Sequence, residues 1–109
     1  MGSITIPDSV SNLGYGLFGF CTNLTGATLG SGITALDSTF RDCHRLASLA
    51  IPNTVTTIGG SVFQNCYNLT NVVIPSSVTS IGSSAFSFCT SLPNIAIPNA
   101  VTTIESAAF

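Results

Sequence analysis

The chain has 109 residues, with 45% hydrophobic and only 6% charged side chains, and a formal net charge of −2 at pH 7. This length accommodates one domain. Lys and Arg together number 2, so no basic patch exists that could bind nucleic acid or an anionic membrane surface. No apolar run approaches the roughly 18 residues of a membrane helix, so we expect no membrane insertion.

A repeat of 23 residues organises the sequence. It is clearest in residues 51–73, IPNTVTTIGGSVFQNCYNLTNVV, and in the near copy that follows, IPSSVTSIGSSAFSFCTSLPNIA. The units are 6–28, 29–50, 51–73, 74–96 and the partial unit 97–109, and the second unit is one residue shorter. Such a period is typical of a solenoid, in which each unit buries its apolar face against its neighbours. We therefore predict a single solenoid domain over residues 1–109.

The spacing of apolar residues within the unit predicts its local structure. Counting from the Ile that precedes Pro, they recur at repeat positions 1, 5, 8, 13, 16, 19 and 22. Around positions 22 and 1 the step is two residues, which predicts a short strand with one buried face. The expected strands are 3–6, 26–29, 48–51, 71–74 and 94–97, stacked as one parallel sheet. From position 13 to 19 the step is three residues, which predicts one or two turns of α- or 3₁₀-helix.

The unit I-P-x-x-V-T-x-I-G-x-x-[AV]-F-x-x-C-x-x-L-x-x-[IV] resembles the BspA-like class of leucine-rich repeats from Ile4 to Phe109. The segment from Leu69 to Ile74 resembles the general L-x-x-L-x-L core of such repeats. The resemblance implies an α/β solenoid, a right-handed arc with a concave parallel sheet of about five strands and short helical segments on its convex side. It also implies an extracellular or cell-surface protein that attaches to host proteins or to other cells.

All four cysteines, Cys21, Cys43, Cys66 and Cys89, occupy repeat position 16. Side chains at one repeat position lie in a column and point the same way. This geometry favours buried thiols that pack as small hydrophobes over disulfides. A metal site would need close pairs such as C-x-x-C, which the sequence lacks, so we predict no metal site.

No constellation of residues in the sequence indicates an enzyme. His44 stands beside Cys43, but neighbouring residues on a helical turn point in different directions, so we expect His44 to face away from the core. The nearby Arg41, Asp42 and Arg45 are consistent with a solvated helical edge or with a charged contact for a partner. Paired acids, a phosphate loop and a nucleophile elbow are all missing, so we predict no enzymatic activity and no cofactor.

The outward strand positions are the best candidates for a binding face. They are Thr5, Thr28, Ser48, Ala50, Asn71, Val73, Asn94 and Ala96. A concave sheet with small, uncharged side chains presents a smooth surface to a protein ligand. Four aromatic residues, Tyr15, Phe20, Tyr67 and Phe88, either pack between neighbouring helical turns or serve as contact anchors. Asn23 and Asn68 begin N-x-T sequons, which suit a turn or accept a glycan.

The alternative function is self-assembly into a filament. The first and last units lack polar capping repeats, and the chain enters and leaves within a repeat, as expected for a piece of a longer protein. If the ends are native, they could stack head to tail between copies of the chain. The candidate end-to-end contacts are Ile4, Ile6, Ile97, Val101, Ile104 and Phe109. The sequence thus predicts a binding module, with polymerisation as the second hypothesis.

Overall fold

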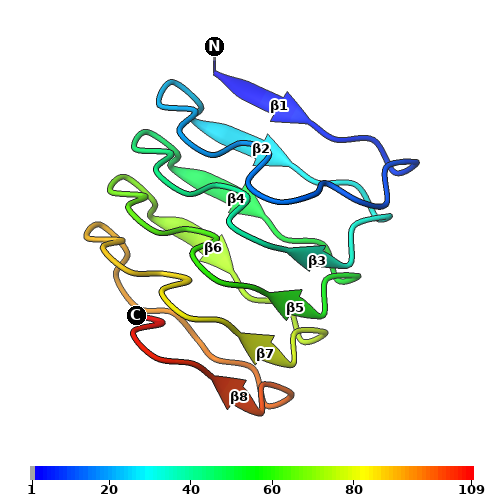
Figure 1. Ribbon diagram of the computed structural model, residues 1–109, viewed down its shortest axis with the longest axis vertical. Coiled ribbons are helices and arrows are strands. Elements are labelled where there is room, and N and C mark those ends of the chain that lie inside the picture. The colour runs from blue at the N-terminus through cyan, green and yellow to red at the C-terminus, as the bar shows by residue number, and fades with distance from the viewer. Residues whose placement is uncertain (1) are drawn as a thin grey trace.

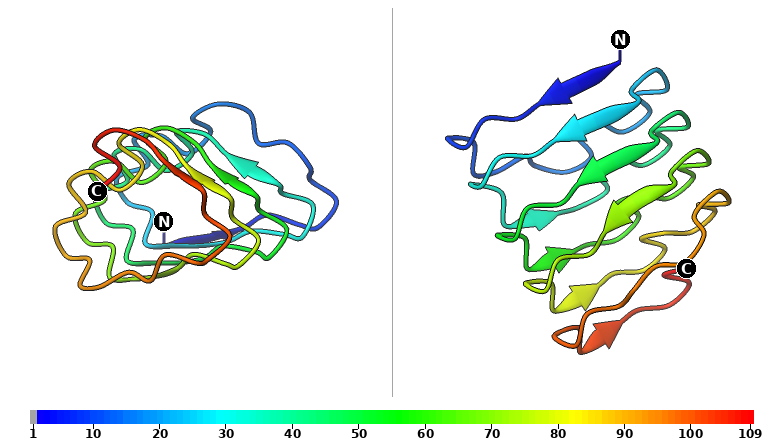
Figure 2. Two further views of the ribbon diagram at one scale, coloured as in Figure 1. Left: turned by 90° about the horizontal axis from the view of Figure 1, so that it is seen from below. Right: turned by 180° about the vertical axis from the view of Figure 1, so that it is seen from behind.

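The computed structural model describes residues 2–109, which form a solenoid of stacked coils, one coil for each repeat unit (Figure 1). Two parallel sheets run along the stack, and the second and third coils each contribute one strand to both of them (Figure 2). The buried apolar side chains form one continuous core between the walls of the coils. The prediction of a solenoid with parallel strands is confirmed.

The first sheet is built from the strands that the two-residue step predicts. Its strands, in spatial order, are β1 (Ser3–Thr5), β2 (Gly26–Thr28), β4 (Ser48–Ala50) and β6 (Asn71–Val73). The register places equal repeat positions side by side, so Ala27 pairs with Leu49 and Leu49 with Val72. These central residues are buried while the strand residues on either side face outward, as the alternation requires.

The fifth expected strand, residues 94–97, does not form, and Pro93 explains why. In three earlier coils the residue at this repeat position donates its backbone N–H to the preceding coil. These donors are Thr25, Ala47 and Thr70, at 2.6, 2.9 and 3.0 Å from their acceptor oxygens. Proline has no N–H and cannot make this bond. The prediction of a fifth strand is therefore wrong, and the first sheet ends at β6.

A second parallel sheet, which the sequence reasoning missed, lies at repeat positions 7 and 8. Its strands are β3 (Ala35–Leu36), β5 (Thr57–Ile58), β7 (Ser80–Ile81) and β8 (Thr103–Ile104), in that spatial order. The V-T-T-I and V-T-S-I segments that carry β5 and β7 are rich in β-branched residues, which suit a pleated surface.

The predicted helical segments are absent from residues 2–109. In the third coil, Ser61 and Asn65 adopt left-handed backbone angles, with φ of 58° and 63°, and such residues cannot continue a right-handed helix. The N–H groups of Ser61, Phe63 and Asn65 donate to carbonyl oxygens of the next coil at 2.9, 2.7 and 2.9 Å. Because alternate N–H groups bond between coils, the three-residue step reflects a series of tight turns. The prediction of a helical convex side is wrong.

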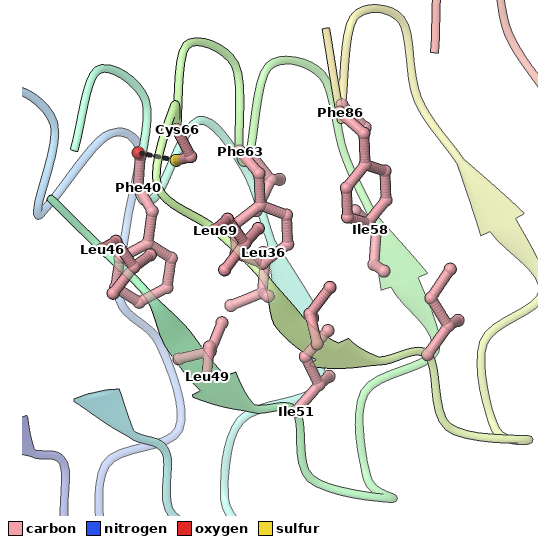
Figure 3. Close-up of a cluster of buried hydrophobic side chains, with 14 of the residues drawn as sticks. Leu36, Phe40, Leu46, Leu49, Ile51, Ile58, Phe63, Cys66, Leu69 and Phe86 are labelled. Carbon is pink, nitrogen blue, oxygen red and sulfur yellow. Dashed lines mark hydrogen bonds between the residues drawn. The ribbon is translucent and has the colours of Figure 1, made fainter. Parts of the chain in front are cut away.

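A column of phenylalanine rings runs through the core (Figure 3). Phe40 and Phe63 stack with ring centroids 5.8 Å apart, and Phe63 and Phe86 at 5.2 Å. Phe18 and Phe109 extend the column at its two ends. Phe63 is completely buried, as its repeat position predicts. The four ring contacts thus link the five coils in one continuous apolar stack.

Glycine is required where neighbouring coils approach backbone to backbone. A Cβ atom on Gly82 would lie 2.6 Å from the carbonyl carbon of Gly59, and one on Gly59 would lie 2.7 Å from the carbonyl oxygen of Leu36. Both contacts are closer than real Cβ atoms tolerate. The two glycines therefore set the tight spacing of the coils beside the second sheet.

Candidate binding surfaces

The outward face of the first sheet carries the predicted binding residues in two rows. Thr5, Thr28, Ala50 and Val73 form one row, and Ser48 and Asn71 lie in the other. All six are exposed, and the side chain of Val73 is the most prominent of them, at 72% exposure. Asn94 and Ala96 are also exposed but lie beyond the last strand, because Pro93 interrupts the ladder. The structure thus brings together six of the eight predicted residues as one sheet face.

This face is hollowed over β2, β4 and β6. The hollow has a volume of about 430 Å³. It is lined by Ala27, Thr28, Ser48, Leu49, Ala50, Ile51, Asn53, Asn71, Val73 and Pro75. None of these side chains is charged. The hollow offers the amides of Asn53 and Asn71 for hydrogen bonds beside the apolar surface of Val73 and Pro75, and its lining has no carboxylate, imidazole, thiol or amine.

The two ends of the solenoid expose part of the core. At the C-terminal end, Ile97, Ile104 and Phe109 are 39%, 49% and 53% exposed. The other predicted end contacts, Ile4, Ile6 and Val101, are half-buried against the core. Open hollows of about 370 and 330 Å³ lie at the two ends. The first is lined by Ile4, Phe18, Cys21, Thr22, Asn23 and Leu24, and the second by Phe86, Phe88, Cys89, Thr90, Leu92, Pro93, Ile95 and Phe109.

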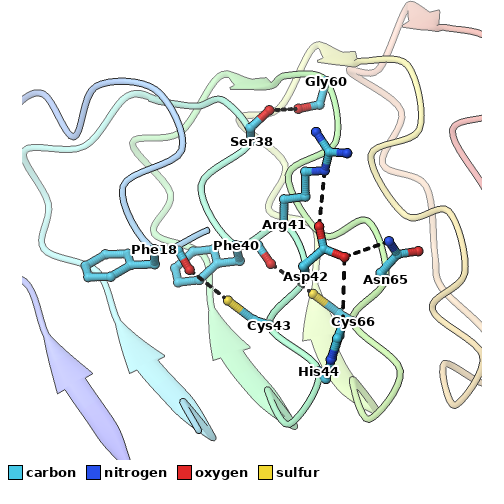
Figure 4. Close-up of polar contacts among 10 residues, drawn as sticks. All are labelled: Phe18, Ser38, Phe40, Arg41, Asp42, Cys43, His44, Gly60, Asn65 and Cys66. Atoms are coloured by element: carbon cyan, nitrogen blue, oxygen red, sulfur yellow. Dashed lines mark hydrogen bonds and ion pairs between the residues drawn. The ribbon is translucent and has the colours of Figure 1, made fainter. Parts of the chain in front are cut away.

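Asp42 is buried and holds a polar cluster on the turns that follow the phenylalanine column (Figure 4). Its Oδ1 accepts a hydrogen bond of 2.8 Å from Nδ2 of Asn65, and its Oδ2 lies 3.2 Å from Nε of Arg41. Nε2 of His44 lies 3.6 Å from Oδ1. A buried carboxylate needs such partners to offset its lost hydration. The prediction of a solvated helical edge is therefore wrong for Asp42, since its left-handed backbone turns the side chain inward against the next coil.

The neighbouring Cys43 and His44 do not form a nucleophile and base. The thiol of Cys43 is buried and donates to the carbonyl oxygen of Phe18 at 3.0 Å (Figure 4). His44 faces the other way and is half-exposed, with its ring 5.0 Å from that of Tyr67. The prediction that His44 faces away from the core is confirmed.

The cysteine column consists of free thiols that pack in the core. Cys66 and Cys89 repeat the bond of Cys43, donating to the carbonyl oxygens of Phe40 and Phe63 at 3.2 and 3.1 Å. Burial raises the pKa of Cys43 and Cys89 to about 11 and that of Cys66 further. These thiols therefore stay protonated at neutral pH and are poor nucleophiles and metal ligands. Over residues 2–109, no cluster of His, Cys, Asp and Glu side chains suits a metal ion.

The interpretation that the aromatic residues outside the core pack between turns holds for Tyr67, whose ring lies against that of His44 in the preceding coil, and is wrong for Tyr15, Phe20 and Phe88, which are largely exposed. Tyr15, Phe20 and Phe88 have 75%, 67% and 65% of their surface exposed, and Tyr67 has 41%. Phe20 and Phe88 also have left-handed backbone angles, with φ of 63° and 61°. A bulky side chain in this region is uncommon and costs about 1–3 kcal/mol. Sequence reasoning missed this strain, although Asp and Asn at the same repeat position in the two middle coils were a signal of it.

Comparisons with known proteins agree with this architecture. The sequence profile of the BspA type leucine rich repeat region matches residues 1–109 in 6 copies. A solved structure of a leucine rich cell surface protein from Faecalibacterium prausnitzii is 44% identical and has a TM-score of 0.83, covering 87% of this chain and 25% of that one. Among curated proteins, no sequence matches the chain.

Two further solved structures are leucine-rich repeat proteins with 28% identity. The protein from Eubacterium ventriosum covers 100% of this chain and 30% of its own length, with a TM-score of 0.92. The protein from T. pallidum covers 97% of this chain and 52% of its own length, with a TM-score of 0.90. The chain thus spans between a quarter and about half of these proteins. Nowhere in residues 2–109 does a helix have the length and apolar character that crossing a bilayer requires.

Leucine-rich-repeat solenoids generally present extended surfaces for protein interactions. The profile match over the whole chain, the stacked parallel strands and the solved structures agree on one assignment. The chain belongs to the BspA-type leucine-rich-repeat family.

Proposed function

We propose that this chain is a non-enzymatic, protein-binding segment of an extracellular or cell-surface protein, and that its affinity resides in the outward face of the first sheet. The observation that carries the proposal is the hollow of about 430 Å³ over β2, β4 and β6, which has no charged lining residue. Because this face has no charged side chain, little hydration free energy is lost when a partner covers it. The exposed Val73 supplies apolar contact area.

An adhesive role and a location at the cell surface are the finer parts of this proposal. The Faecalibacterium prausnitzii structure is described as a cell surface protein, and it is 44% identical over most of this chain. The low content of charged side chains, 6%, and the abundance of Ser, Thr and Asn are consistent with attachment through many weak contacts. Adhesion would then depend on repeated small contributions from successive coils.

A matched pair of substitutions tests the binding face. Ala50→Lys places a charge in the hollow of the first sheet, whereas Ala35→Lys places the same charge on an exposed strand position of the second sheet. We would incubate fluorescently labelled protein with cultured epithelial cells and measure the bound fraction by flow cytometry. The proposal predicts saturable binding that Ala50→Lys reduces at least tenfold and Ala35→Lys leaves unchanged. Equal effects of the two variants, or no saturable binding, would contradict it.

Self-assembly is the second candidate function, and the exposed apolar surface of the last coil favours it. Phe109 stacks on Phe86 with centroids 5.2 Å apart and leaves its other ring face open. Another copy could seat its half-buried Ile4 and Ile6 on this surface, and a repeated contact of this kind makes a filament. Sedimentation over a range of concentrations, with Phe109→Ser as the variant, tests it. Reversible fibres that the variant abolishes are expected, and a monomer at all concentrations would contradict polymerisation.

A further inference from the structure

We propose that Phe20 and Phe88 anchor a second contact surface, distinct from the first sheet, and that its partner is an acidic, extended protein segment with an apolar side chain at each end. We call this surface the turn edge. It comprises the exposed turns that follow the phenylalanine column, with Phe20, Arg41, Arg45, Tyr67 and Phe88 as its main side chains.

The backbone at repeat position 15 is left-handed in all four coils that contain it, and the residue type there is informative. The two middle coils have Asp42 and Asn65, whose short polar side chains adopt this conformation at low cost. The outer two coils have Phe20 and Phe88, which adopt it with strain. Neither ring gains core packing in return, because 67% and 65% of their surface is exposed. A strained and exposed aromatic residue that the fold does not need indicates a residue kept for contact with a partner.

The surroundings of both rings provide room for an apolar side chain of a partner. Phe20 borders a hollow of about 170 Å³ that is also lined by Tyr15, Gly16, Gly19, Ser38 and Arg41. Phe88 borders the hollow of about 330 Å³ with Leu92 and Phe109. Each ring therefore forms one wall of an open recess that has at least one further aromatic side chain in its lining.

The charge between the two rings selects an acidic partner. Arg41 and Arg45 are the only Lys or Arg residues of the chain, and both lie in the second coil, between the coils of Phe20 and Phe88. Together with Asp42, the two arginines give residues 41–45 a net charge of +1. The other three acidic residues, Asp8, Asp37 and Glu105, bring the net charge of the whole chain to −2. Arg41 is engaged by Asp42, but Arg45 has no carboxylate within 4.0 Å among residues 2–109. The turn edge is thus the one positively charged stretch of an acidic molecule.

The spacing of the rings sets the length of the partner segment. Phe20 and Phe88 occupy the same repeat position three coils apart, which corresponds to about 14 Å at the usual distance between strands. An extended peptide rises about 3.4 Å per residue, so apolar side chains four residues apart would reach both rings and project from the same side. The residue midway between them projects from the same side, so an acidic side chain there would face Arg45.

The test uses a fluorescein-labelled peptide, Phe-Asp-Glu-Asp-Phe, and fluorescence anisotropy with the purified chain. We expect saturable binding that weakens at least tenfold with Phe20→Asn and with Phe88→Asn, and also with Arg45→Glu. A charge-reversed peptide, Phe-Lys-Arg-Lys-Phe, should bind at least tenfold more weakly than the acidic one. Ala35→Asn, on the second sheet, is the matched control and should leave binding unchanged.

Thermal melts of the same variants separate contact from structure. Asn relieves the left-handed strain, so Phe20→Asn and Phe88→Asn should melt at the same or a higher temperature while losing the peptide. Lower melting temperatures for both would mean that the rings hold the fold, and would overturn the proposal. It is also overturned if the peptide does not bind, or if both Phe variants bind it normally. If sedimentation instead shows a dimer that Phe20→Asn dissociates, the occupant is a second copy, and the acidic segment is ruled out.

Discussion

The third and fourth coils, residues 51–73 and 74–96, share the same core yet differ in their edges. At the seven apolar repeat positions they differ only where Val72 is replaced by Ile95. The third coil ends in strand β6, whereas the fourth coil adds no strand to the first sheet, because Pro93 stands where the third coil has Thr70. The repeated positions therefore build the stack, and single residues outside them decide whether a coil extends the sheet.

The residue at repeat position 15, the corner residue that precedes the cysteine of each coil, also differs between these two coils. Asn65 of the third coil donates to the buried carboxylate of Asp42, so its side chain serves the fold. Phe88 takes the same backbone conformation in the fourth coil with its ring in solvent. Equivalent positions in two near copies thus serve stability in one coil and, in our proposal, surface recognition in the other.

The largest expected effect comes from the shared core. Phe63→Ala removes a fully buried ring that stacks on Phe40 and Phe86, and it should cost about 3–5 kcal/mol of unfolding free energy. Urea unfolding followed by circular dichroism measures this loss. Phe109→Ala, at the exposed end of the same column, is the matched control and should cost much less. A Phe63→Ala variant that unfolds like its parent would mean that the ring column does not hold the coils together.

The second comparison exchanges the corner residues. Asn65→Phe gives the third coil the corner of the fourth, removes the 2.8 Å donor to buried Asp42 and adds left-handed strain. The expected cost is about 2–4 kcal/mol, since the carboxylate loses a hydrogen bond while it stays buried. The reverse exchange, Phe88→Asn, should not destabilise the chain. Similar losses from both exchanges in urea unfolding would show that the two corners are equivalent.

A smaller effect is expected when the third coil receives the proline of the fourth. Thr70→Pro removes the N–H that donates to the carbonyl oxygen of Ala47 at 3.0 Å, and should cost about 1 kcal/mol because solvent is nearby. Thr70→Ser keeps the N–H and serves as the control. In Thr70→Pro, NMR spectra that detect backbone hydrogen bonds should also show that the bonds of β6 are lost. A retained β6 in Thr70→Pro would show that another feature ends the sheet.

A further effect, which needs no substitution, is a loss of stability at alkaline pH. Burial raises the pKa of Cys43 and Cys89 to about 11, whereas an unfolded thiol titrates near about 8.5. Between these values the unfolded chain releases protons that the folded chain retains, so the stabilisation present below about pH 8.5 falls as the pH rises toward 11. The urea midpoint under reducing conditions should therefore decrease from pH 8 to pH 10. Cys89→Ala should flatten the decrease, and an unchanged slope would mean that this thiol is not responsible.

Much of the solenoid was predictable because its core positions repeat. The period placed Phe63, Cys66 and Leu69 in the core, and all three are fully buried. The same spacing was misread as helical, since a three-residue step describes helical turns and the tight turns of this backbone equally well. Only the pairing of alternate N–H groups with the next coil distinguishes them, and that pairing is a contact between repeats rather than a property of one.

The candidate surfaces were predictable to a lesser degree. Alternation placed Ala50 and Val73 outward on the first sheet, where they line the hollow. Strand β5 was not predicted, because a two-residue strand is too short for alternation to reveal. The burial of Asp42 depends on Asn65 in the next coil, so it could not be read from the charge pattern of its own segment.

Amide hydrogen exchange of the third and fourth coils, in the parent chain and in Pro93→Thr, tests most directly whether one residue outside the repeated positions ends the first sheet. We predict slow exchange in Asn71–Val73 of both proteins, fast exchange over residues 94–97 of the parent, and slower exchange over residues 94–97 of Pro93→Thr. Protection that is unchanged over residues 94–97 in Pro93→Thr, or already slow in the parent, would contradict this account.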